Sequence, residues 1–252
     1  MQSITIIVDR FFGFMQKNAS KDEYTRYLSW RWCHDAFVDK RRQYQNTSND
    51  NEKREIEDYL ALHLGFYLAS WGMYRGSSFL LQRDYKTHVK AVREILNKKY
   101  DYLWNMNPLD NNFNTQTASQ LLFGNPDCIY WFLKNNAYGT VATDTLVTKI
   151  LLGTFGCLPA FDRYLKMGIR HHNKCSFSDS RLSPNIESKG AFDKLLVFVN
   201  KNSTELGALA RKYDYPVMKI VDLYFWLIGY EKDVLGSLNS NNVSKAIKMP
   251  FV

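Results

Sequence analysis

The chain has 252 residues, of which 45% are hydrophobic and 15% aromatic, which is enough for a sizeable core and excludes a fully disordered protein. Its formal net charge of +8 favours an acidic partner, with nucleic acid ahead of a membrane surface. The longest apolar stretches are short and interrupted by charge, so no bilayer-spanning helix is predicted and we expect a soluble protein.

The four cysteines are scattered and lack the C-x-x-C spacing of a zinc ribbon. No signal-like apolar run follows a basic start, so a secreted disulfide framework is not predicted either. We therefore expect reduced thiols in a cytoplasmic protein that holds no metal and no cofactor. The cysteines are Cys33, Cys128, Cys157 and Cys175.

Long helices are predicted in the first part of the chain. Residues 20–42 begin with a capping-box pattern, Ser20 followed by Glu23, and continue with large apolar side chains at roughly helical spacing. After a polar, turn-rich loop, residues 52–76 form a second long helix that ends at a glycine. Residues 85–99 have one apolar face and one lysine-rich face, which predicts an amphipathic helix.

A polar segment, residues 105–117, is the clearest compositional break in the chain. Further helices are predicted at residues 125–139, with a proline and an aspartate in the first turn, and at residues 143–156. Residues 171–190, which start with two adjacent histidines, indicate an irregular connection. Three more helical segments follow it.

The fold class that follows is all-α, because the sequence shows neither an internal repeat nor a run of alternating strand-like residues. We expect two helical lobes with a cleft between them. The N-terminal lobe comprises residues 1–106 and is completed by residues 190–252, and the central lobe comprises residues 107–189.

Residues 154–168, TFGCLPAFDRYLKMG, place a proline and a carboxylate where a helix begins. Pro159 suits a first helical turn because it has no N–H to lose, and Asp162 would oppose the helix dipole. The same geometry would also hold the Asp162 carboxylate rigidly at the mouth of a cleft. The segment alone leaves both interpretations open.

Residues 138–165, YGTVATDTLVTKILLGTFGCLPAFDRYL, run from a glycine turn through a helix and a short reversal to Asp162. This order resembles the helix-hairpin-helix superfamily of DNA base-excision glycosylases, in which a glycine hairpin between two helices grips phosphate and a catalytic aspartate begins a following helix. The family's leucine-proline-glycine-x-glycine pattern is reduced here to one glycine. The resemblance implies that Gly139, Thr140 and Lys149 bind DNA and that Asp162 is the catalytic carboxylate.

The resemblance also implies a monofunctional enzyme. In bifunctional members of the family the lysine nucleophile would fall near Thr143, where this chain has no lysine, and the four-cysteine iron–sulfur cluster has no counterpart. Arg170 and His171, which follow the Asp162 segment, could add phosphate contacts.

The chemistry explains why a carboxylate and a pocket are both required. Hydrolysis of an N-glycosidic bond passes through a sugar with oxocarbenium character, which a fixed carboxylate stabilises. The nucleotide must also turn out of the duplex into a pocket that offers stacking and hydrogen bonds. Residues 67–79, YLASWGMYRGSSF, supply such groups, although a buried tryptophan with a glycine helix cap explains them equally well. The candidate pocket residues are Trp71, Tyr74, Arg75, Ser77 and Ser78.

The predicted function is therefore a DNA N-glycosylase that flips out and removes a modified base, with hypermodified viral DNA as one substrate class in a defence role. The first alternative is a non-catalytic helical nucleic-acid-binding or interaction protein, in which Asp162 only begins a helix. The second is a helical nuclease or toxin, for which residues 31–37, RWCHDAF, are the nearest motif.

Overall fold

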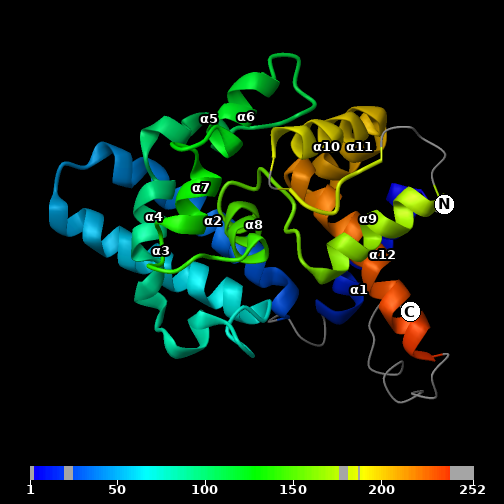
Figure 1. The fold of residues 1–252 in the computed structure, drawn as a ribbon, viewed down its shortest axis with the longest axis horizontal. Coiled ribbons are helices and arrows are strands. Elements are labelled where there is room, and N and C mark those ends of the chain that lie inside the picture. The colour runs from blue at the N-terminus through cyan, green and yellow to red at the C-terminus, as the bar shows by residue number, and fades with distance from the viewer. Residues whose placement is uncertain (1–2, 20–24, 176–180, 187, 239–252) are drawn as a thin grey trace. The chain divides into compact units, whose positions relative to one another are not determined.

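The structure is a computed structural model that describes residues 3–19, 25–175, 181–186 and 188–238. Over these ranges the chain forms α-helices, short 3₁₀ helices and connecting loops, and no β-strand. The predicted all-α class is confirmed. Figure 1 shows the order of the helices along the chain.

The helices form two compact units that are interleaved along the sequence. Unit 1 contains Met1–Tyr24, Asn107–Phe113 and Pro159–Val252, and unit 2 contains Thr25–Met106 and Asn114–Leu158. The chain thus leaves unit 2 and returns to it, whereas the sequence suggested lobes of residues 1–106 with 190–252 and of residues 107–189.

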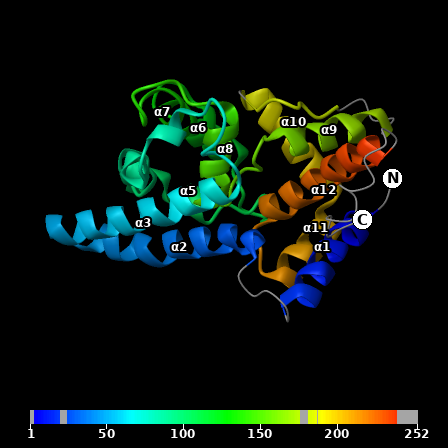
Figure 2. The ribbon, with the colours of Figure 1, turned by 90° about the horizontal axis from the view of Figure 1, so that it is seen from below.

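Unit 2 is built on a pair of long helices, α2 (Ser29–Asn46) and α3 (Asp50–Ser70), which pack side by side (Figures 1 and 2). The Asn49 side chain begins α3 by accepting the N–H groups of Asn51 and Glu52. The remaining α-helices of this unit are α4 (Val89–Ile95), α5 (Asp101–Trp104), α6 (Thr115–Phe123), α7 (Ile129–Asn135) and α8 (Asp144–Gly153). The 3₁₀ helices are η1 (Arg26–Leu28), η2 (Phe79–Gln82), η3 (Tyr85–His88) and η4 (Lys98–Tyr100).

Helix α8 is the central helix of unit 2, since it packs on both α2 and α3 and its residues 146–153 are all buried. The indole Nε1 of Trp30 donates to the carbonyl of Leu152 at 2.8 Å, which satisfies a group at the end of α8. Gly153 lies against the ring of Tyr67, where any side chain would collide. Contacts of this kind, in which a large ring packs directly on a glycine, hold α8 against α2 and α3.

Unit 1 is organised around α12 (Val217–Leu238), which packs against α9 most extensively and also against α1 and α11. The run from residue 217 to residue 230 is buried throughout, which explains its nearly unbroken apolar sequence. The other helices of the unit are α1 (Ile4–Ala19), α9 (Arg163–Cys175), α10 (Lys189–Lys201) and α11 (Ser203–Tyr213).

Several predicted helix boundaries differ from the observed ones. Helix α3 ends at Ser70 and not at Gly76, and α4 covers only Val89–Ile95 of the helix predicted at residues 85–99. Helix α9 begins at Arg163, so Pro159 precedes the helix and does not occupy its first turn. Helix α7 begins at Ile129 with Cys128 as its N-cap, so the proline and aspartate before it are also outside the helix. Residues 171–175 belong to the last turns of α9, and not to a loop.

The capping box predicted at Ser20 and Glu23 lies outside the described residues. The helix that follows in the structure begins at Ser29. Among the residues that the structure describes, none of the helices combines the length and the apolar composition that a membrane span requires.

Candidate nucleic-acid interface

The side chain of Asp162 is the N-cap of α9. Its Oδ1 accepts the backbone N–H groups of Tyr164 at 3.0 Å and Leu165 at 3.1 Å, and its carbonyl accepts the N–H of Lys166. These bonds satisfy N–H groups that would otherwise have no intrahelical partner. The structural role that the sequence predicted for Asp162 is therefore present, and the carboxylate is held rigidly at the start of the helix.

A buried ion pair of α12 holds the chain just before this cap. Oδ1 of Asp222 accepts a hydrogen bond from the N–H of Ala160 at 3.0 Å, and its Oδ2 accepts one from the ammonium of Lys219 at 2.8 Å. Both charged side chains are buried. Because buried charges are tolerated only when they are paired and hydrogen-bonded, the pair commits the 159–162 segment to one position on α12.

Two glycines bring the backbones of α9 and α12 into direct contact. A Cβ at Gly168 would overlap the carbonyl of Phe225, and a Cβ at Gly229 would overlap the carbonyl of Tyr164. Since neither clash could be relieved by a side-chain rotation, this close crossing fixes which face of α9 points into unit 1.

The opposite face of α9 is basic. Its charged residues follow one another at spacings of three, four and four, which places them within an arc of about 80° at 3.6 residues per turn. The helix contains no acidic residue. The buried residues Leu165, Gly168 and Ile169 lie on the other side. The four basic residues are Arg163, Lys166, Arg170 and Lys174.

These cations form a concentrated positive field. Arg163 donates to Asp233, whereas the other three basic residues have no acidic partner within the described ranges. Partial burial, together with the positive charges of Lys232 and Lys174, lowers the pKa of His171. Arg170 is exposed beside it. Burial is the main cause of this lowered pKa, and the two cations act on His171 in the same direction.

His172 belongs to the packed side of α9. Its ring meets those of Phe198 and Phe225 edge to face, at centroid distances of 5.3 and 5.5 Å. Burial lowers its pKa, with a contribution from neighbouring His171. The two adjacent histidines therefore have different roles, and only His171 lies toward the basic face.

The candidate pocket residues lie at the end of α3 and in the loop after it. Trp71 is the C-cap residue of α3, and its indole Nε1 donates to Ser29 Oγ at 3.1 Å. The ammonium of Lys149 lies 5.3 Å from the Trp71 ring, in cation–π contact. Lys149 is only 4% exposed, so this side chain faces the interior of unit 2 rather than a surface where phosphate would bind.

Tyr74 connects this loop to a buried histidine that the sequence did not single out. The Tyr74 hydroxyl lies 2.7 Å from Nε2 of His88, and Nδ1 of the same ring lies 3.0 Å from the hydroxyl of Tyr138. Gly65 leaves room for Tyr85 of η3, whose Cβ would lie only 3.1 Å from a Cβ added at this glycine. Burial lowers the pKa of His88 to about 4, so the imidazole is neutral and can donate from one nitrogen and accept at the other.

The other pocket candidates have local roles. Arg75 and Ser77 are exposed, while Ser78 caps η2 by accepting the N–H of Leu80. Gly72 and Gly76 both adopt positive φ, as tight turns with glycine do. The residues of the 67–79 stretch therefore do not converge on one point.

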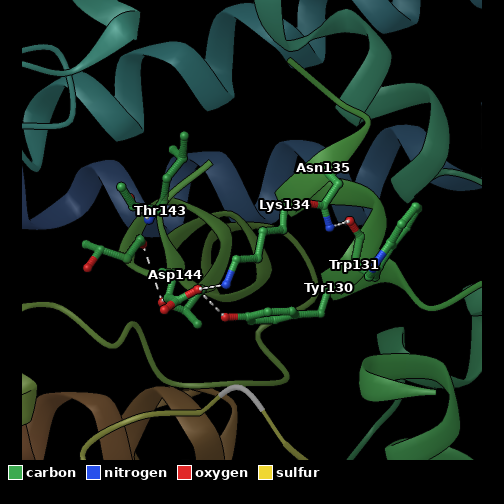
Figure 3. Close-up of polar contacts among 9 residues, drawn as sticks. Tyr130, Trp131, Lys134, Asn135, Thr143 and Asp144 are labelled. Atoms are coloured by element: carbon green, nitrogen blue, oxygen red, sulfur yellow. Dashed lines mark hydrogen bonds and ion pairs between the residues drawn. The ribbon is translucent and has the colours of Figure 1, made fainter. Parts of the chain in front are cut away.

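The predicted phosphate-gripping hairpin is the turn between α7 and α8. Gly139 is at φ 68° and is exposed together with Thr140, as a phosphate-binding turn would require. The first turn of α8, however, carries Asp144. Tyr130 and Lys134 of α7 each donate to Oδ1 of this carboxylate at 2.7 Å, as Figure 3 shows.

This carboxylate changes what the hairpin can bind. A helix N-terminus attracts anions because its N–H groups are unpaired and its dipole is positive there. In α8 the Thr143 side chain already accepts the N–H of Leu146, and Asp144 supplies a negative charge. Because Thr143 already caps the start of α8 and Asp144, paired with Lys134, opposes its dipole, we regard α9 as the better candidate for phosphate contacts.

The predicted site residues are distributed over both units. Asp162, Arg170 and His171 belong to unit 1, and the candidate pocket and the hairpin belong to unit 2. Within unit 2, the His88 network connects the 67–79 loop to Tyr138, next to the hairpin glycine.

Four groups near the candidate sites were not predicted from the sequence, namely Lys166, Lys174, Asp222 and His88. The first two share a helical period with Arg163 and Arg170, and the third forms an i, i+3 pair with a lysine inside an apolar run, so both patterns were visible. His88 had no such signal. Within the described ranges, no group of three or more His, Cys, Asp or Glu side chains could hold a metal ion.

Comparison of the chain with protein-family models, with curated proteins and with solved structures found no match.

Proposed function

We propose that this protein binds DNA and that the basic face of α9 makes the phosphate contacts. The observation that carries the proposal is the row of Arg163, Lys166, Arg170 and Lys174 on a helix without any acidic residue. Cations in such a row bind successive phosphates and release the counterions that had condensed on them.

The supports of α9 fit this role. Its packed side is fixed by the glycine crossing with α12, and its start is fixed by Asp162 and Asp222. The basic side chains therefore project from a rigid helix, which reduces the conformational entropy lost on binding. About 16 Å separate the first and last of the four residues along the helix axis, at 1.5 Å per residue.

The test is the affinity for a fluorescently labelled DNA duplex, measured by anisotropy at low salt. The triple variant Lys166→Gln, Arg170→Gln and Lys174→Gln should bind at least about tenfold more weakly, because it loses three phosphate contacts. A matched control with the same change of charge is Arg42→Gln, Arg83→Gln and Lys98→Gln, three exposed positions of unit 2. Equal affinities for the two triple variants would refute the role of α9.

Base release is the second candidate function. The observation that favours it is the rigid position of the Asp162 carboxylate at the start of the helix that would contact DNA. A fixed carboxylate at this position is suited to stabilise an oxocarbenium ion.

Base release is tested with duplexes that contain modified bases and with mass spectrometry of the released base. Asp162→Asn preserves the cap but removes the charge, so the variant should bind DNA like the parent and lose about 100-fold or more in rate. If the parent binds DNA through α9 but releases no base from any duplex, base release is contradicted and DNA binding stands alone.

A further inference from the structure

The basic face of α9 has a neighbouring element of unit 1 on each side. At about 100° per residue, His171 and Asn173 lie about 160° apart around the helix axis. Arg170 and Lys174 of the basic face lie between them. Tyr164 is about 20° from His171 and therefore lies on the same side. We name the two sides of the basic face the His171 side and the Asn173 side.

The segment of residues 181–186 is tied to the Asn173 side. Nδ2 of Asn173 donates to the carbonyl of Leu182 at 2.7 Å, and Oδ1 of the same side chain accepts a hydrogen bond from the N–H of Leu182 at 3.0 Å. Two bonds from one side chain fix the backbone of Leu182 next to α9. Leu182 is buried, whereas Arg181 directly before it is exposed. Arg181 therefore adds a cation on the Asn173 side.

Helix α12 covers the His171 side. The ring centroid of Tyr164 lies 5.4 Å from that of Tyr230, and the Tyr164 hydroxyl donates to Asp233 at 3.3 Å. Lys232, which is adjacent to Asp233 in the sequence, is exposed. After burial, its charge is the largest cause of the lowered pKa of His171, which agrees with a position on this side. Lys232 therefore adds a second cation, across the basic face from Arg181.

The acidic residues around these cations are already engaged. Glu231 and Asp233, on either side of Lys232 in the sequence, each form an ion pair with an arginine. Asp162 is engaged in the cap of α9. Among the described residues, neither Lys232 nor Arg181 has an acidic partner. The positive charge of α9 thus continues onto both sides of the helix.

A basic helix with further cations on both sides matches the shape of a DNA duplex. A single strand offers one line of phosphates, whereas a duplex offers two lines with a groove between them. An α-helix with its side chains is about 10–12 Å wide, which fits the major groove of about 12 Å and exceeds the minor groove of about 6 Å. Cations on the two sides of such a helix reach the phosphates of opposite strands.

We propose that α9 lies along the major groove of double-stranded DNA and that Arg181 and Lys232 contact phosphates of opposite strands. The inference rests on the proposed function, because it assigns a form of DNA and two further residues to the same surface. A single strand would bind along the basic face of α9 alone, since one line of phosphates cannot follow both sides of the helix.

The test compares a fluorescently labelled duplex with one of its strands alone, by anisotropy over a range of salt concentrations. The double variant Arg181→Gln and Lys232→Gln should bind the duplex about fivefold or more weakly. The slope of log Kd against log salt concentration should fall in magnitude by about 1.8, that is, about 0.9 for each lost contact. Each single variant should lose about half of this slope. Affinity of the double variant for the single strand should change by no more than about twofold.

The matched control is the double variant Lys17→Gln and Arg211→Gln. It removes the same charge from exposed positions of α1 and α11 in the same unit and should bind both forms of DNA like the parent. The groove is tested with a duplex whose pyrimidines carry a bulky C5 substituent, which projects into the major groove as the methyl group of thymine does. The parent should bind this duplex about tenfold or more weakly, and equal affinity would contradict the position of α9.

Failure of this inference is distinct from failure of the proposed function. If the triple variant of α9 loses affinity for the duplex and the Arg181→Gln, Lys232→Gln variant does not, α9 binds DNA but the two sides do not. The inference is also wrong if the parent binds the single strand as tightly as the duplex, or if the control loses as much affinity as the double variant. The same holds if the double variant loses affinity for both forms equally. A parent that binds neither form at low salt refutes DNA binding itself.

Discussion

Gly168 of α9 lies so close to the carbonyl of Phe225 on α12 that a side chain of any size would overlap it. The two helices touch through their backbones at this point, and the same contact turns the basic face of α9 away from α12. The packing of unit 1 and the position of the candidate DNA-binding face therefore depend on Gly168, together with Gly229, which makes the same kind of contact with the carbonyl of Tyr164.

Replacing Gly168 should be costly. In Gly168→Ala the new methyl group forces α9 and α12 apart, and overpacking of this kind costs about 1–3 kcal/mol or more. Gly13→Ala is the control, because nothing lies within 4 Å of its added Cβ and alanine stabilises a helix by about 0.5–1 kcal/mol relative to glycine. The midpoint of urea denaturation should fall for Gly168→Ala and rise for Gly13→Ala, relative to the parent. A Gly168→Ala protein as stable as the parent would show that the helices are not held this closely.

The cap at Asp162 gives a graded prediction. Asp162→Ala removes the acceptor for the N–H groups of Tyr164 and Leu165 and should cost about 1 kcal/mol. Asp162→Asn keeps an acceptor and should cost less, about 0.3–1 kcal/mol for the lost interaction with the dipole. Hydrogen exchange at these two amides is the measurement. Equal protection in both variants would mean that the cap does not hold the start of α9.

The neutral His88 should make stability depend on pH. Its pKa is lowered by burial from 6.5 to about 4, so the unfolded chain binds a proton over a pH range in which the folded chain does not. Its contribution is complete above about pH 6.5, is lost at about 1.4 kcal/mol per pH unit as the pH falls, and levels off near pH 4.

The variant His88→Gln isolates this contribution, since the pKa values of His63, His171 and His172 are also lowered and add slopes of the same sign. We expect His88→Gln to be less stable than the parent at pH 7.5, because Tyr74 and Tyr138 lose their partner. Its free energy of unfolding should then fall less steeply between pH 6.5 and 4.5. An identical slope in the two proteins would show that His88 does not titrate in this way.

The start of α8 is already capped by Thr143 and carries Asp144, so we expect that the hairpin makes no phosphate contact. Thr140→Glu, at an exposed turn position, should change the affinity for duplex DNA by no more than about twofold. Arg170→Glu changes the charge on α9 by two units and should weaken binding by about fivefold or more. Arg170→Gln removes one unit of charge, as Thr140→Glu does, and is therefore the matched comparison. Thr140→Arg, which adds one unit of positive charge, completes the set. If Thr140→Glu lowers the affinity for DNA as much as Arg170→Glu does, the hairpin contacts phosphate and this prediction is wrong.

The sequence was sufficient for local features of the fold. Start and stop signals predicted a helix at residues 143–156, where α8 lies, and three helical segments were predicted near the end of the chain, where α10, α11 and α12 lie. The side chain of Asp162 indicated where a helix begins. The boundary error at Pro159 arose because proline also suits a first helical turn, and the sequence cannot say whether proline or aspartate marks the start.

Long-range features could not be predicted in the same way. The pairing of Ala160 with Asp222 and of Tyr74 with His88 joins residues that no local pattern relates. The interleaving of the two units could not be predicted for the same reason. The chain returns to unit 2 at Asn114, and this return depends on packing between helices that are distant in the sequence. The histidines of α9 were assigned to a loop because polar residues dominate there, although the period of the basic residues is helical.

The most direct test of DNA binding through α9 is the slope of log Kd against log salt concentration for a duplex. Each phosphate contact contributes about 0.9 to this slope, so the triple variant Lys166→Gln, Arg170→Gln and Lys174→Gln should lower its magnitude by about 2.7. The control Arg42→Gln, Arg83→Gln and Lys98→Gln should keep the parent's slope. An α9 variant whose slope equals that of the parent, or a parent that does not bind DNA at low salt, would contradict the account.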